Sequence, residues 1–138
     1  MIVLDTNVVS DAMRVSPTRS VAAWIARLNP RDLFTTSITE AEILLGIAIL
    51  PEGRRNSDLQ EAAQRVMSLF ASRILPFEST AARSFSQIVA GRRRVGMPIN
   101  DFDAQIAAIT LSHGMALATR NTSDFQGIGI NLIDPWNS

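Results

Sequence analysis

The chain has 138 residues, and its 13 acidic side chains balance 13 basic ones, all of which are arginine. The length predicts a single domain over residues 1–138, and an apolar fraction of 46% is enough for one hydrophobic core. The absence of lysine and cysteine excludes a P-loop, Schiff-base chemistry, disulfides, thiolate zinc sites and cysteine nucleophiles, and one histidine cannot supply a histidine-rich metal centre.

Short apolar runs alternate with helical patterns along the chain. The apolar runs predict strands at residues 2–5, 33–36, 74–77, 116–119 and 131–133, the third at a sheet edge because it contains a proline. Helices are predicted at residues 7–14, 20–28, 37–50, 58–71, 79–94 and 101–113. In the third helix we expect Ser37 as the N-cap and Glu40 as its capping-box partner, and the apolar residues after Glu42 predict a buried helix or an interface. Gly114 is expected at the C′ position of the last helix.

Strands separated by helices indicate a parallel sheet with helices on both faces. In open sheets of this kind, sites lie beyond the carboxyl ends of the strands. Asp5 closes the first predicted strand and Asp124 follows the fourth, so both are expected at that edge.

The first two acidic candidates are Asp5 and Glu42. Asp5 directly follows three apolar residues, and burying its carboxylate costs several kcal/mol unless it has partners; the alternative is an N-cap for the next helix. Glu42 shares a helical face with Ile38 and Ile49, so it requires a cation or a hydrogen-bond donor, and the alternative is an arginine ion pair.

The later acidic candidates lie in the first turn of the last helix and in the segment that follows the fourth strand. The helix dipole favours Asp101 and Asp103 by ~0.3–1 kcal/mol each, and Asp101 or Asn100 can serve as the cap. Asp103 lies one turn before Ile106, which directs it toward the packed side and makes it the better ligand candidate. Asp124 either belongs to the acidic site or only caps a turn. Because gathered carboxylates repel one another unless cations neutralise them, the four segments together predict a Mg²⁺ or Mn²⁺ site and hydrolysis of a phosphodiester.

The sequence contains one basic run, and its first residues show no targeting pattern. Arg92, Arg93 and Arg94 predict either a phosphate-backbone contact or a solvated helix end that suits the dipole. No signal peptide is visible, and the apolar stretch at residues 43–50 is much shorter than the ~20 residues of a membrane span, so we expect a soluble cytoplasmic protein without a membrane partner.

Four motifs in this order resemble the PIN-domain nuclease family, most of all its VapC- and FitB-type toxins. They are Ile2-Val3-Leu4-Asp5-Thr6-Asn7, the helix at residues 37–46, Pro98 to Ala108, and Leu117 to Phe125. The resemblance implies an acidic quartet of Asp5, Glu42, Asp103 and Asp124, with Asp101 and Asn121 as secondary support. Thr6, which follows Asp5, either supports the site or simply starts the helix. It also implies a three-layer α/β/α domain with a five-stranded parallel sheet, a homodimer, and a small DNA-binding antitoxin that brings the complex to operator DNA.

The resulting hypothesis is a metal-dependent endoribonuclease. Asp5 and Asp103 hold one or two Mg²⁺ or Mn²⁺ ions, Glu42 and Asp124 complete the shell or orient the attacking water, and Arg92, Arg93, Arg94 and Arg120 hold the RNA backbone. One alternative is a regulatory module that dimerises, forms a DNA-bound complex with its antitoxin and cleaves little. A third possibility is a structure-specific nuclease that acts on DNA with the same carboxylates.

Overall fold

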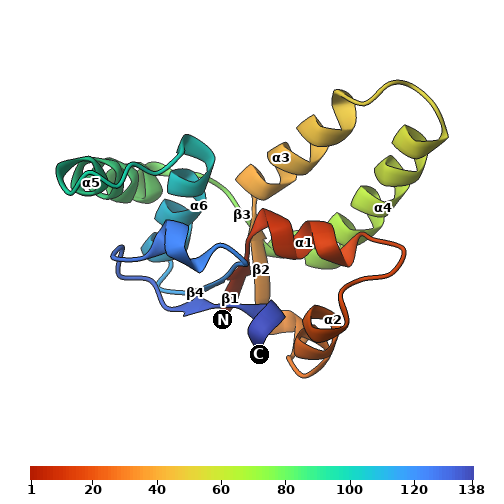
Figure 1. The fold of residues 1–138 in the computed structure, drawn as a ribbon, viewed down its shortest axis with the longest axis horizontal. Helices are drawn as coiled ribbons and strands as arrows, with labels where there is room; N and C mark the ends of the chain where they lie inside the picture. Colours follow the sequence, from red (N-terminus) through yellow and green to blue (C-terminus); the bar gives the residue numbers. More distant parts are fainter.

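The computed structural model describes all residues from 1 to 138 and has a five-stranded, wholly parallel sheet at its centre (Figure 1). The strand order is β3-β2-β1-β4-β5. The strands are β1 (Ile2–Leu4), β2 (Leu33–Thr36), β3 (Ile74–Leu75), β4 (Ala116–Ala118) and β5 (Leu132–Ile133). In the central strand Val3 pairs with Phe34 of β2 and Leu117 of β4. Because all strands run the same way, their carboxyl ends meet at one edge.

Six helices cover the sheet on both sides, which confirms the predicted three-layer architecture (Figure 1). They are α1 (Thr6–Ala12), α2 (Arg19–Ala26), α3 (Ser37–Ala48), α4 (Arg54–Phe70), α5 (Ser79–Arg94) and α6 (Asp101–Ser112). Single 3-10 turns follow or precede strands: η1 (Pro30–Asp32), η2 (Ala71–Arg73), η3 (Thr122–Phe125) and η4 (Pro135–Asn137). No helix combines the length and the apolar character that a bilayer crossing requires.

Alternation along β1 explains why the core has two halves. Leu4 packs in a cluster with residues of α1 to α4, such as Val8 and Ile43, while Val3 packs with residues of α5 and α6, such as Ile106. Successive side chains of a strand point to opposite faces, so the single run Ile2-Val3-Leu4 supports both layers at once. This leaves the residue that follows, Asp5, at the rim where both layers meet.

The structure corrects details of α3 and α4. The N-cap of α3 is Thr36 and not Ser37: the Thr36 hydroxyl accepts from the backbone N–H of Thr39 at 3.1 Å, so Glu40 has no capping-box partner at the expected place. The helix is also not buried throughout, because Leu44 and Leu45 are more than half exposed. Helix α4 begins at Arg54, earlier than the expected residue 58.

The end of α6 agrees with the sequence. The helix stops at Ser112 with His113 as its C-cap, and Gly114 has φ +64°. That left-handed conformation costs glycine little, which confirms the expected helix stop. The chain then enters β4 and returns to the edge of the sheet where Asp5 lies.

Candidate functional site

Asp5 lies where β1 ends and α1 begins, and it serves both as a helix cap and as a buried acid. Its side chain is 4% exposed. Oδ1 accepts from the backbone N–H of Thr6 at 2.8 Å, and Oδ2 accepts from the Thr119 hydroxyl at 2.8 Å. Burial raises the pKa of Asp5; these two hydrogen bonds oppose the change, and the negative charges of Glu42 and Asp124 add to it.

Glu42 reaches the same region from the first half of α3. Its Oε1 accepts from the Thr6 hydroxyl at 2.7 Å, and the Thr6 oxygen lies 3.1 Å from the hydroxyl of the fully buried Thr39. The pKa of Glu42 is raised, first by burial and then by the charge of Asp103, while the Thr6 hydrogen bond lowers it. Thr6 therefore links the chain segments that carry Asp5 and Glu42, which is the supporting position that the sequence suggested for it.

Asp103 stands in the first turn of α6. Its backbone N–H donates to the side-chain oxygen of Asn100, the helix N-cap, at 2.9 Å, and Asn100 Nδ2 donates to Asp103 Oδ2 at 2.7 Å. Burial raises the pKa of Asp103 to about 6; the negative charges of Asp5 and Asp124 add to this, and the hydrogen bond from Asn100 opposes it. Of the two acids in this turn, Asp103 is half-buried and Asp101 is exposed, as the helical phase predicted.

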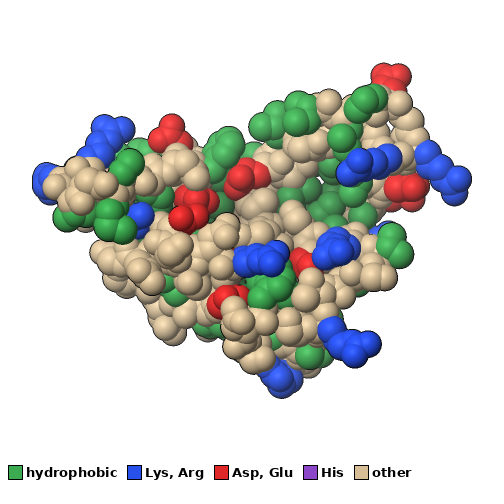
Figure 2. All heavy atoms as spheres, in the orientation of Figure 1, with side chains coloured by type: hydrophobic (Ala, Val, Ile, Leu, Met, Phe, Trp, Pro, Cys, Tyr) green, Lys and Arg blue, Asp and Glu red, His purple; other side chains and the backbone are tan.

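Asp124 closes the group from the short turn η3 after β4. Its side chain is exposed, and its backbone N–H donates to the Asn121 carbonyl at 3.0 Å. Its charge contributes to the raised pKa of both Asp5 and Asp103. The structure thus brings four carboxylates from four separate segments within electrostatic reach of one another. Figure 2 shows acidic side chains over α6 and in the dip between α6 and α3.

None of the four carboxylates has an arginine partner. The chain's single ion pair lies elsewhere, between Arg14 and Asp11, with Arg14 Nη1 3.4 Å from Asp11 Oδ1. As the side chains stand, no three acidic or histidine residues are arranged to hold a metal ion. The donors on offer are carboxylate oxygens, which suit Mg²⁺ and Mn²⁺, and Mg²⁺ keeps most of its waters and binds through one or two carboxylates. The chemistry of the donor set therefore fits such an ion through Asp5 and Asp103.

The predicted basic contacts divide into two groups. Arg93, Arg94 and Arg120 are exposed, and the guanidinium carbon of Arg120 lies 5.2 Å from the centre of the Trp136 ring. Arg92 is instead buried and donates to three backbone carbonyls, so it is not placed to hold an RNA backbone, contrary to expectation. Helical spacing could have predicted this burial, because Arg92 lies one turn after the buried Ile88 and shares its inward face.

Two threonines that the sequence did not mark as part of the site, Thr119 and Thr39, help to hold the acids in place. Thr119 donates to Asp5 and also accepts from the backbone N–H of Asn121 at 3.1 Å, which gives Asn121 a supporting place through its backbone. The Thr39 hydroxyl lies 3.1 Å from the Thr6 hydroxyl that donates to Glu42, and Asn100, one of the two expected caps, donates to Asp103. A threonine directly after the apolar run of β4 was the available signal, since fully buried hydroxyls need a partner.

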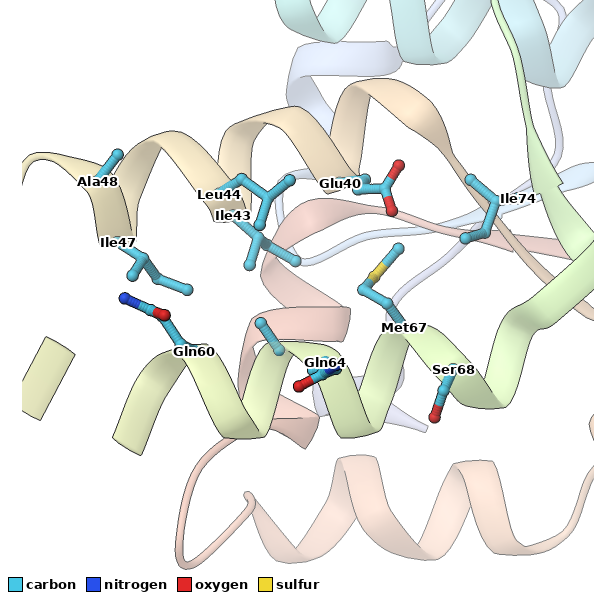
Figure 3. A pocket seen from close by; sticks show the side chains of 11 residues that line it. Glu40, Ile43, Leu44, Ile47, Ala48, Gln60, Gln64, Met67, Ser68 and Ile74 are labelled. Atoms are coloured by element: carbon cyan, nitrogen blue, oxygen red, sulfur yellow. The ribbon is translucent and has the colours of Figure 1, made fainter. Parts of the chain in front are cut away.

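A separate apolar groove lies between α3 and α4. Figure 3 shows Ile43, Leu44 and Ile47 of α3 facing Gln60 and Met67 of α4 across it. The groove has a volume of about 670 Å³, and Glu40 stands at the end that belongs to the first turn of α3. A smaller hollow between α1 and α3 includes Thr6 and Glu42 and shares Ile43 and Ile47 with the groove. The groove and the hollow that includes Glu42 therefore share part of a wall.

Comparison with known proteins agrees with this geometry. The PIN domain family model matches residues 2–130. The VapC ribonuclease Y4jK of Sinorhizobium fredii is 39% identical over 137 residues, covering 99% of this chain and 98% of that protein. The toxin FitB of Neisseria gonorrhoeae is 38% identical, with 99% of each chain covered. A solved structure of FitAB bound to an IR36 DNA fragment superposes with a TM-score of 0.91 at 38% identity, covering 99% of this chain and 96% of that one. The chain therefore belongs to the PIN domain family, in the group that includes the VapC and FitB toxins.

Proposed function

We propose that this protein is a metal-dependent endoribonuclease and the toxin of a toxin–antitoxin pair. One observation carries the proposal: Asp5, Glu42, Asp103 and Asp124 come together from four segments, three of them with raised pKa values, and no arginine neutralises them. Such a group is costly unless a cation binds there. Similarity to the VapC ribonuclease Y4jK supports RNA as the substrate.

Each acidic residue has a role that follows from its contacts. Asp5 and Asp103 would hold Mg²⁺ or Mn²⁺; when bound, the ion supplies a lowered pKa for a bound water and neutralises charge on the scissile phosphate. The Asp5 oxygens keep a free lone pair each after accepting from Thr6 and Thr119. Glu42 is oriented by Thr6 through Oε1, so its other oxygen, Oε2, is the one we assign to receive the proton of the attacking water. Asp124 completes the polar shell from η3.

The exposed arginines are assigned to the RNA backbone. Arg93 and Arg94 end α5, and Arg120 follows β4 directly after the buried Thr119 that holds Asp5. Guanidinium groups bind phosphates through a planar fork of donors. Because the chain's net charge is zero, binding depends on these local positions and should weaken as salt rises.

The proposed partner is an antitoxin that covers the α3–α4 groove. The groove is lined by apolar side chains and stays open in the structure of the single chain. We assign it to an amphipathic segment of the cognate antitoxin, because such segments bind grooves of this kind through spaced apolar anchors. By analogy with FitAB, this complex, with two copies of the chain, would bind operator DNA through the antitoxin. Its expected location is the cytoplasm, where RNA is accessible.

The test is cleavage of structured RNA by purified protein with Mg²⁺ or Mn²⁺, compared with Asp5→Asn and Asp103→Asn. Asp32→Asn is the matched control, because Asp32 is exposed and belongs to η1, which precedes β2 and so lies at the opposite edge of the sheet. We expect cleavage by the wild type and the control, and loss of most of it in the two site variants and with EDTA. Equal cleavage by wild type and Asp5→Asn would refute the assignment. Operator binding by the antitoxin complex without any metal-dependent cleavage would favour the regulatory alternative.

A further inference from the structure

The guanidinium group of Arg92 joins the end of α5 to two other parts of the chain. Only 8% of the residue is exposed. Its Nε donates to the Met97 carbonyl at 2.6 Å, and its Nη1 donates to the carbonyls of Asp124 and Gln126, both at 3.0 Å. No carboxylate forms an ion pair with it. A buried cation that binds only backbone oxygens holds those oxygens in place, because moving any of them leaves buried charge without a partner.

Two of the three carbonyls lie on either side of Phe125, in the turn that carries Asp124. Phe125 is 1% exposed and anchors this turn in the core, while the Asp124 side chain is exposed. The position of the Asp124 carboxylate is therefore set by its backbone, and Arg92 fixes that backbone before and after the anchor. The next residues of α5, Arg93 and Arg94, are exposed on the same helix end.

We propose that Arg92 is a positioning residue that keeps the Asp124 carboxylate beside Asp5 and Asp103. The proposal rests on the proposed function in that Asp124 contributes to hydrolysis. Lysine retains the charge but lacks the planar fork that reaches three carbonyls from fixed directions. A displacement of about 1 Å in a reacting group can lower a rate by roughly 100-fold, so a small shift of η3 is sufficient for a measurable effect.

The test compares Arg92→Lys with Arg83→Lys, the same change at an exposed arginine of α5 that has no part in the proposed site. We expect Arg92→Lys to accelerate amide hydrogen exchange at residues 121–127 while α6 stays protected, and to lower kcat about 10-fold or more with KM changed less than about twofold. Arg83→Lys should leave exchange and kcat unchanged. In an Asp124→Asn background, Arg92→Lys should lower kcat little further, because both changes act on the same group.

Three results would overturn the proposal. They are unchanged exchange at residues 121–127 in Arg92→Lys, an unchanged kcat, or an equal further loss of kcat in the Asp124→Asn background. If the wild type cleaves no RNA, the proposed function fails by itself, and the exchange comparison between Arg92→Lys and Arg83→Lys still decides whether Arg92 fixes the turn. Arg92→Gln, which removes the charge, serves as the second variant and should show the larger increase in exchange.

Discussion

Replacing Asp103 with asparagine should stabilise the metal-free protein, although it removes a residue of the proposed site. The pKa of Asp103 is raised from 3.8 to about 6, first by burial and then by the charges of Asp5 and Asp124. A raised pKa means that the folded chain binds this proton more tightly than the unfolded chain. The free energy of unfolding therefore falls as the pH rises through the interval from about 4 to about 6, and stays lower above it.

The size of the effect follows from the shift and the exposure. One pKa unit corresponds to ~1.4 kcal/mol, so the shift sets a ceiling of about 3 kcal/mol at neutral pH. The side chain is only half-buried, and solvent screening reduces this to about 1 kcal/mol. Asparagine also gives up a favourable interaction of ~0.3–1 kcal/mol with the α6 dipole. Asp101→Asn measures that loss alone, since Asp101 shares the helix turn but is exposed.

The assay is denaturant unfolding in EDTA near pH 8 and again near pH 4, where the Asp103 term is mostly absent. Near pH 8 we expect the free energy of unfolding of Asp103→Asn to exceed that of Asp101→Asn by about 1 kcal/mol, equivalent to about 4 °C in Tm. Near pH 4 the two variants should have nearly the same stability. Equal stability of the two variants at the higher pH would refute the claim that burial and the neighbouring carboxylates destabilise the charged form of Asp103.

Three further predictions concern other parts of the molecule. Mg²⁺ or Mn²⁺ should raise the Tm of the wild type beyond the effect of NaCl at equal ionic strength, and chelation should reverse the rise. The free energy of unfolding should increase by up to about 2.7 kcal/mol at an ion concentration of about 100 times Kd, and calorimetry of Asp5→Asn should show no such gain. Thr119→Val should cost about 1–3 kcal/mol in unfolding free energy near pH 8 and less at acidic pH, because it leaves the charged form of Asp5 without its buried donor. Leu44→Arg, in the α3–α4 groove, should weaken antitoxin binding at least about 10-fold in a titration. Leu45→Arg, which is about as exposed but lies outside the groove, should leave binding unchanged. Weaker binding by Leu45→Arg than by Leu44→Arg would place the antitoxin elsewhere.

Local sequence was sufficient to predict the order and type of the elements, because apolar runs and helical periods repeat clearly along the chain. Local sequence did not predict the starts of two helices, because there the usual capping residues are absent or displaced. Helix α4 begins after Gly53, which has φ +151° and provides no side-chain cap, so nothing in residues 54–57 marks a helix start. The cap of α3 is Thr36 because the helix begins directly after β2, so the extended backbone that an N-cap needs belongs to the last strand residue and not to Ser37.

For the site too, local patterns predicted the main positions, and contacts between distant residues were not predictable. Because the carboxyl ends of parallel strands meet at one edge, the sequence predicted that Asp5 and Asp124 would lie close together. The donors that hold these acids lie far away in the chain: Thr119 is 114 residues from Asp5, and Arg92 is 32 residues from Asp124. Pairings over such separations depend on the finished packing, and three consecutive arginines look alike until the helical phase of Ile88 is taken into account.

The buried Asp11 has an arginine partner, and the acids of the site have none. This difference supports a bound cation at the site. Asp11 accepts from the backbone and hydroxyl of Thr18 at 3.0 and 2.7 Å and pairs with Arg14, so its charge is satisfied within the fold and ties α1 to α2. The site acids are held only by uncharged donors, such as the hydroxyls of Thr6 and Thr119. Uncharged donors orient a carboxylate without neutralising it, whereas an arginine would occupy its oxygens and cancel its charge. Asp11 has an arginine partner and the four converging carboxylates have none, and this contrast supports the proposal that a metal ion balances their charge.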